Sequence, residues 1–225
     1  MSSYGVEKFL ADLAYKKKGD RQSYLDQSIY KDQIKIHQGT SHADFFSAED
    51  VLGEKHFNVH RGSKTQEDWL NTNTLLARNF LSDSSRFKRA SQMSLHDADR
   101  YASSKTNDGL KKQVVEIGHS MGGTLAEQIA IQHNHQSVVF NQGTTPFRDY
   151  TNIDRSKHVH VRNKEDIVSM FDNNEKTIQV HSVNGNGLFP VSDLRTLLGG
   201  TNFTLYVAGS IYGAINGHKL NTFKQ

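Results

Sequence analysis

QVVEIGHSMGGTLAEQIAI, residues 113–131, carries the clearest structural signal in this chain of 225 residues. Its first five residues form a short, mainly apolar run, which is typical of a strand buried in a parallel sheet. Residues 118–123 are rich in glycine and predict a turn, and residues 124–131 predict a helix. We therefore expect a buried strand that turns abruptly into a helix.

The turn fits the pattern G-x-S-x-G, with Ser120 as its serine. Glycines at positions 118 and 122 let strand and helix approach closely, and the turn presents the serine hydroxyl at the carboxyl end of the sheet. The N–H of Met121, at the helix start, would face a developing oxyanion. We predict that Ser120 is a nucleophile. The alternative is a tight glycine-rich turn without chemistry, and the strand and helix around the motif favour the nucleophile.

The rest of the chain predicts an α/β fold of the α/β-hydrolase type, with a mainly parallel sheet flanked by helices. Strands are expected at residues 29–38, 57–60, 113–117, 137–140, 157–162, 176–183 and 203–207. Helices are expected at residues 5–18, 66–80, about 84–103, 124–131 and 193–198. One domain over residues 1–225 accommodates these elements, with a candidate lid or cap at about 70–105.

A serine nucleophile needs a base, and the base needs a carboxylate that orients it. In this fold class the chain order is Ser, then the acid, then His, so both partners are expected after the serine. We predict that the acid is Asp166, four residues after the strand 157–162, because loops after strands carry functional groups. A loop-capping role is its structural alternative. Asp154, Asp172 and Glu165 are weaker candidates.

The base is predicted among 12 histidines, so residue type alone says little. His218 is preferred because it follows the last predicted strand and could fold back over the serine. His181 also follows the predicted acid and stays a rival. His158 and His160 precede the acid and are expected to lie in a strand. His119 adjoins the serine, but its side chain is expected to point elsewhere.

The second oxyanion donor is predicted at Ser63, where a strand upstream of the serine ends. Gly62 permits close approach of the backbone, and Ser63 offers both an N–H and a hydroxyl. The alternative is an ordinary turn in which Ser63 caps the helix 66–80. The two roles are compatible because both use the N-terminus of a helix.

The composition narrows the class of protein. The net charge is only +3, and the charges are interspersed without a basic stripe, so nucleic-acid binding is not expected. We interpret the basic run Lys16-Lys17-Lys18 as the solvated end of the helix 5–18, stopped by Gly19. The alternative is contact of this run with phosphate or an anionic membrane. The chain has no cysteine, which excludes disulfides and a cysteine nucleophile. Neither an apolar signal core nor a bilayer-spanning apolar run is present, so we expect a cytoplasmic protein, intracellular or viral.

Four segments of the chain are similar to those of the class 3 lipase family, which includes the fungal triacylglycerol lipases. The segments are HRGS at 60–63, DW at 68–69, IGHSMGGTLA at 117–126 and NKEDIV at 163–168. The resemblance covers about residues 57–170 and reaches the tail through His218. It implies a Ser120–Asp166–His218 triad and an oxyanion hole formed by Ser63 and Met121, without a cofactor. A metal site is not expected either, because the histidines show no H-x-x-x-H or H-E-x-x-H spacing on a helix.

The resemblance also implies hydrolysis of carboxylic esters, with a lipid or a small ester as substrate and transient contact with a membrane or lipid surface. The chain departs from the secreted fungal enzymes by being shorter, by lacking disulfides and by a polar 71–105 region with Arg78, Arg86 and Arg89. These departures favour an intracellular relative or an esterase for more soluble substrates. The alternatives are a hydrolase fold that binds without catalysis, and a thioesterase or amidase.

Overall fold

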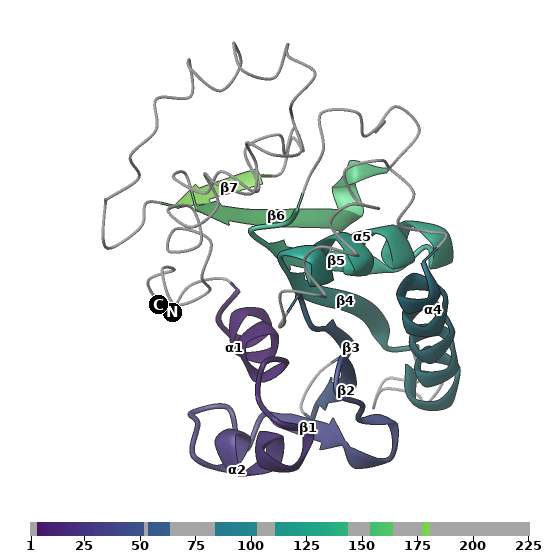
Figure 1. Ribbon diagram of the computed structural model, residues 1–225. Coiled ribbons are helices and arrows are strands. Elements are labelled where there is room, and N and C mark those ends of the chain that lie inside the picture. Colours follow the sequence, from purple (N-terminus) through teal and green to yellow (C-terminus); the bar gives the residue numbers. More distant parts are fainter. Residues whose placement is uncertain are drawn as a thin grey trace.

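The computed structural model describes residues 4–51, 54–63, 84–102, 111–143, 154–163 and 177–180. Its centre is a seven-stranded sheet (Figure 1). The strands are β1 (Ile34–His37), β2 (Phe45–Asp50), β3 (Lys55–His60), β4 (Gln113–His119), β5 (Gln136–Phe140), β6 (His158–Asn163) and β7 (Thr177–Val180). The helices are α1 (Gly5–Leu13), α2 (Arg21–Asp26), α4 (Ser85–Asp97) and α5 (Met121–His133), with a π-helical turn at Ala98–Ala102 and 3-10 turns at Lys18–Asp20, Gln38–Thr40 and Arg155–Lys157.

The strands follow one another across the sheet in chain order. β1, β2 and β3 pair antiparallel, whereas β3 to β7 are parallel neighbours. The expected α/β fold with a mainly parallel sheet is therefore confirmed. His60 lies opposite Gly118 and His119 lies opposite Phe140 in the register. The carboxyl ends of β3, β4 and β5 thus share one edge of the sheet.

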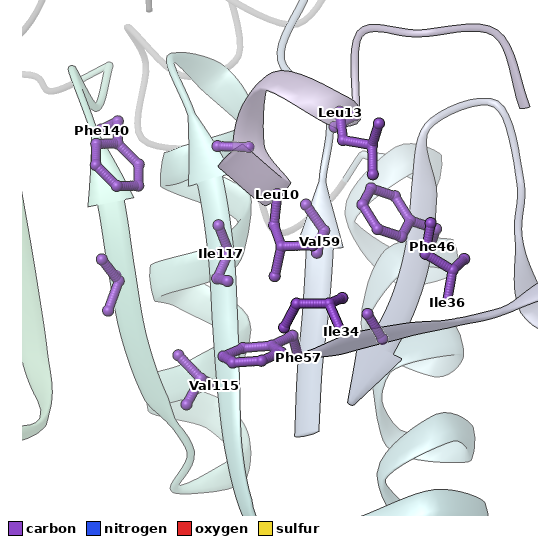
Figure 2. Close-up of a cluster of buried hydrophobic side chains, with 14 of the residues drawn as sticks. Leu10, Leu13, Ile34, Ile36, Phe46, Phe57, Val59, Val115, Ile117 and Phe140 are labelled. Carbon is purple, nitrogen blue, oxygen red and sulfur yellow. The ribbon is translucent and has the colours of Figure 1, made fainter. Parts of the chain in front are cut away.

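One face of the sheet is apolar and is covered by α1 (Figure 2). Leu10 and Leu13 of this helix pack on alternate strand residues, since side chains along a strand point to opposite faces. These strand residues include Ile34, Ile36, Phe46, Phe57, Val59, Val115, Ile117 and Phe140, all buried. The burial of this apolar area is the main contribution to folding on this side.

The opposite face lies under α4 and α5 (Figure 1) and is mostly polar. The two helices pack on each other through Phe87, Ala90, Leu125 and Ile129. Beneath them the strands present buried polar side chains: His56, Asn58, His60, Glu116, Ser137, His158 and His160. Such groups are tolerated in a core only when they have hydrogen-bond partners.

Glu116 is the centre of this polar layer. Its carboxylate accepts hydrogen bonds from His60 at 2.7 Å, His135 at 2.8 Å, Asn58 at 3.0 Å and Ser94 at 2.5 Å. Burial by itself raises the pKa of Glu116, but the hydrogen bonds from the two histidines outweigh it and hold the pKa well below its ordinary value. Glu116 is therefore a buried carboxylate stabilised by four neighbours.

Glu127 of α5 forms a second pair of contacts in the same layer. It bonds His160 of β6 at 2.7 Å and Gln142 at 2.5 Å. His158 bonds Ser137 at 3.0 Å. Both β6 histidines lie in a strand, as expected, and both are buried.

Several predicted elements need correction. The helix 5–18 ends at Leu13, so the lysine run lies in a turn after the helix and in the 3-10 turn. The strand 29–38 is reduced to Ile34–His37, because the N–H groups of residues 33 and 34 both bond the Tyr30 carbonyl in a turn. The helix 124–131 begins three residues earlier, at Met121. β2 and α2 were not predicted.

Other predictions fall wholly or partly outside the described residues. The helices 66–80 and 193–198 and the strand 203–207 lie there completely. Of the candidate lid at about 70–105, residues 85–97 form α4, which packs on α5. For the remaining residues of the segment 70–105, the lid stays a prediction. Within the described part of the chain, each helix is too short or too polar to cross a bilayer.

The buried His56 predicts a pH dependence of stability. Burial lowers its pKa from the ordinary 6.5 to about 4, a difference worth roughly 3 kcal/mol. As the pH falls, His56 is therefore protonated in the unfolded chain before it is protonated in the folded chain. The folded state keeps its full stability above pH 6.5 and loses this amount of free energy as the pH falls towards 4. Urea unfolding at stepped pH should show a declining free energy of unfolding over this window, with a shallower decline for His56→Gln. Equal slopes for the two proteins would contradict this explanation.

Candidate active site

Ser120 stands between β4 and α5 in a strained backbone conformation, with φ 58° and ψ −130°. A positive φ is costly for a residue with a side chain and persists only where the surroundings impose it. Here the Ser120 N–H donates to the Phe140 carbonyl at 3.0 Å, and its carbonyl accepts from the N–H groups of Gly123, Thr124 and Gly143. The half-buried serine is thus fixed at the carboxyl edge of the sheet.

Two glycines make the sharp turn sterically feasible. A Cβ on Gly118 would lie 2.6 Å from the Gly123 nitrogen. A Cβ on Gly122 would lie 2.6 Å from the Arg61 carbonyl carbon and 2.7 Å from the Gly62 nitrogen. Since these neighbours are backbone atoms, they cannot rotate aside. The first turn of α5 therefore touches both its own strand and the loop that leaves β3.

The loop after β3 brings Ser63 beside Met121. The Ser63 hydroxyl lies 3.6 Å from the Met121 sulfur, within the range of a weak hydrogen bond to sulfur. Met121 is the first residue of α5, so its N–H is one of those that a helix leaves without an intrahelical acceptor. The structure thus gathers Ser63, Met121 and Ser120, while the roles of the first two as oxyanion donors stay predictions.

Tyr15 contacts both the end of β4, at His119, and the loop after β3, at Gly62. Its phenol oxygen lies 2.8 Å from Nδ1 of His119. The phenol oxygen also accepts a hydrogen bond from the backbone N–H of Gly62. This bond lowers the phenol pKa because it stabilises the deprotonated form. Burial dominates and raises the Tyr15 pKa above its ordinary value, so the phenol keeps its proton and can donate it to His119. The His119 side chain therefore points towards Tyr15, which follows α1.

The loop is also held from the side of β2. The Arg61 guanidinium forms a salt bridge of 2.5 Å with the Asp44 carboxylate. The backbone N–H of Arg61 also donates to the backbone carbonyl of Asp44 at 2.9 Å. Tyr15 and Asp44 were not among the predicted site residues. Their contacts join segments distant in the chain, and no local motif marks them.

The remaining predicted residues are placed differently. Asp154 is exposed and precedes the amino end of β6, whereas Ser120 follows the carboxyl end of the parallel β4. These are opposite edges of the sheet, which argues against Asp154 as the acid. Asp166, His218, His181, Asp172 and Glu165 lie outside the described residues. Among the described side chains, no group of three or more His, Asp or Glu is arranged to hold a metal ion.

A parallel strand, a serine at positive φ and a helix that starts at the next residue have the geometry expected of a nucleophile elbow of the α/β-hydrolase class. The family model of the Tle-like phospholipase domain matches residues 9–223. The chain belongs to this family. A comparison with curated proteins finds no match. Family membership supports hydrolysis of lipid esters in general and does not single out the fungal class 3 lipases.

Gly122→Ala tests the close approach of α5 and the β3 loop. The added methyl group would collide with the backbone of residues 60–62 and push the loop away from Met121. We expect a loss of roughly 1–3 kcal/mol in the free energy of unfolding and at least a tenfold loss of ester turnover. Gly19→Ala is the matched control, since a Cβ there meets nothing within 4 Å. Comparable losses in both variants would refute the steric explanation.

Tyr15→Phe tests the hydrogen bonds that join the segment after α1 to the loop after β3 and to His119. It removes one oxygen and leaves the buried Gly62 N–H and one nitrogen of His119 without the phenol. We expect a loss of about 1–3 kcal/mol, measured by thermal or urea unfolding. Tyr24→Phe serves as control because Tyr24 is 47% exposed. If the two variants were equally stable, the Tyr15 hydroxyl would not contribute to the free energy of unfolding.

Proposed function

We propose that this chain hydrolyses carboxylic-ester bonds of phospholipids through an acyl-enzyme on Ser120. The single observation that carries the proposal is the backbone of Ser120, held at φ 58° between β4 and α5 and followed by Met121, which Ser63 contacts. Strain at a serine in this position is expected when its hydroxyl must be presented to a substrate. Membership in the Tle-like phospholipase family supports a lipid ester as substrate.

The proposed chemistry has two halves. The Ser120 oxygen attacks the ester carbonyl carbon while His218 takes the hydroxyl proton. The tetrahedral oxyanion accepts hydrogen bonds from the N–H groups of Ser63 and Met121. His218 then gives the proton to the departing alcohol, which leaves the acyl group on Ser120. A water molecule, deprotonated by the same histidine, releases the fatty acid and restores the serine.

Asp166 is the proposed carboxylate that orients His218. β6 ends at Asn163, and β6 is parallel to β4. The chain therefore leaves β6 at the edge of the sheet where Ser120 lies, three residues before Asp166. This placement supports Asp166 over Asp154, which precedes the opposite end of β6. Contact with a lipid surface during turnover is part of the same proposal.

Ser120→Ala tests the proposed nucleophile. Phospholipid vesicles or mixed micelles serve as substrate, and mass spectrometry of the products shows which bond is cut. We expect the wild-type chain to release fatty acid and lysophospholipid, and the variant to lose on the order of 10⁴-fold or more in kcat with its fold intact. Ser23→Ala, at an exposed serine of α2, is the control and should keep full turnover.

Each alternative gives a different product pattern. Diacylglycerol or phosphatidic acid would mean that a phosphoester is cleaved and would exclude the acyl-enzyme. Turnover of thioesters or amides, without turnover of matched oxygen esters, would indicate a thioesterase or amidase. A wild-type chain that binds lipid without turnover would be a non-catalytic hydrolase fold.

The assignment of the base is tested by comparing two histidine variants in the same assay. His218→Ala is expected to lower kcat about as strongly as Ser120→Ala, because a triad without its base loses most of its rate. His181→Ala is expected to keep most of the activity. The reverse order would make His181 the base.

A further inference from the structure

Arg86 reaches from the first turn of α4 to the backbone of the loop after β3. One of its terminal nitrogens donates to the Arg61 carbonyl at 2.5 Å and to the Gly62 carbonyl at 3.3 Å. The other lies 3.9 Å from the sulfur of Met121. The sequence marked Arg86 only as one of the charged residues that make the region 71–105 polar. Instead, the side chain is partly buried and points towards the elbow.

These carbonyls matter because each shares a planar peptide with an N–H group. The described residues contain no cis peptide bond, so the C=O and N–H of each peptide point in opposite directions. The Gly62 carbonyl belongs to the same peptide as the Ser63 N–H. The Ser63 N–H therefore points away from the guanidinium that binds the Gly62 carbonyl.

The preceding peptide is fixed at both of its ends. Its carbonyl, on Arg61, accepts from Arg86, and its N–H, on Gly62, donates to the phenol of Tyr15. Tyr15 in turn contacts His119, the residue before the proposed nucleophile. Two successive peptides of the loop are thus oriented by groups outside it, and Arg86 contacts both of them.

A guanidinium suits this task better than an ammonium. It is planar, permanently charged and carries several donors in a fixed fork, so it can hold two adjacent carbonyls at once. Hydrogen bonds from a charged donor are also stronger than those from a neutral one. An oxyanion hole is effective only when its donors are oriented before the charge develops.

We propose that Arg86 is a positioning residue, which directs the Ser63 N–H towards the oxyanion formed at Ser120 without touching the substrate. This inference rests on the proposed function. Loss of the guanidinium should affect the transition state more than the bound substrate. We expect Arg86→Ala to lower kcat on the order of 10²-fold, the scale for loss of one oxyanion donor, with KM changed less than about threefold.

The experiment compares the wild-type chain with Arg86→Ala, Arg86→Lys and the control Lys88→Ala. Lys88 is an exposed cation on the same helix, so its loss reproduces the change in charge. Steady-state kcat and KM on a soluble ester are measured with and without added guanidinium at concentrations too low to unfold the protein. Thermal unfolding midpoints show whether each variant is folded. We expect Arg86→Lys to retain part of kcat, and guanidinium to restore part of kcat in Arg86→Ala alone.

Three outcomes would overturn the inference while leaving the proposed function in place. They are a kcat of Arg86→Ala within twofold of the wild type, an equal loss of kcat in Lys88→Ala, and a loss that neither guanidinium nor Arg86→Lys reduces. A wild-type chain without ester turnover would instead overturn the proposed function, and this inference with it. Comparison with the wild type therefore separates the two failures.

Discussion

The structure depends on one close approach, in which the first turn of α5 lies against the backbone of the loop that leaves β3. Ser120 makes it possible because its φ of 58° lets the helix begin directly at the end of β4. Gly122 then occupies the point where helix and loop meet. The strain at Ser120 is maintained by its backbone hydrogen bonds to β5 and α5. The proposed oxyanion hole depends on this contact, since it brings Ser63 beside Met121.

The two faces of the sheet support this contact in different ways. The apolar face under α1 supplies burial of hydrophobic area, and α1 leads into Tyr15, which bonds the loop. The face under α4 and α5 is polar, and its buried carboxylates need nearby partners to be tolerated. Glu116 therefore fixes β4 to His60 at the end of β3, and Glu127 fixes α5 to β6 through His160. Directional bonds as well as packing therefore join the strands and the helix near Ser120.

The sequence predicted what local patterns control. The strand, turn and helix of residues 113–131 follow from apolar periodicity and glycine spacing, and all three appear in the structure. β2 was missed because its FFSAED sequence lacks a clear alternation and is defined by pairing with β1 and β3. Tyr15 and Arg86 could not be predicted, since their contacts span 104 and 25 residues. Glu116 gave a partial signal, because a charge within a buried strand requires a partner, but the sequence did not identify His60 and His135.

The family supports a lipid ester hydrolase, and the elbow explains how such chemistry would be arranged on this fold. The central claim is that the hydroxyl of Ser120 is an activated nucleophile. The most direct measurement is reaction of the folded chain with a fluorophosphonate, with detergent present, followed by mass mapping of the modified peptide. We predict one adduct per chain, on Ser120, that disappears when the protein is unfolded before reaction. A folded chain without an adduct, or with its adduct on another residue, would contradict this account.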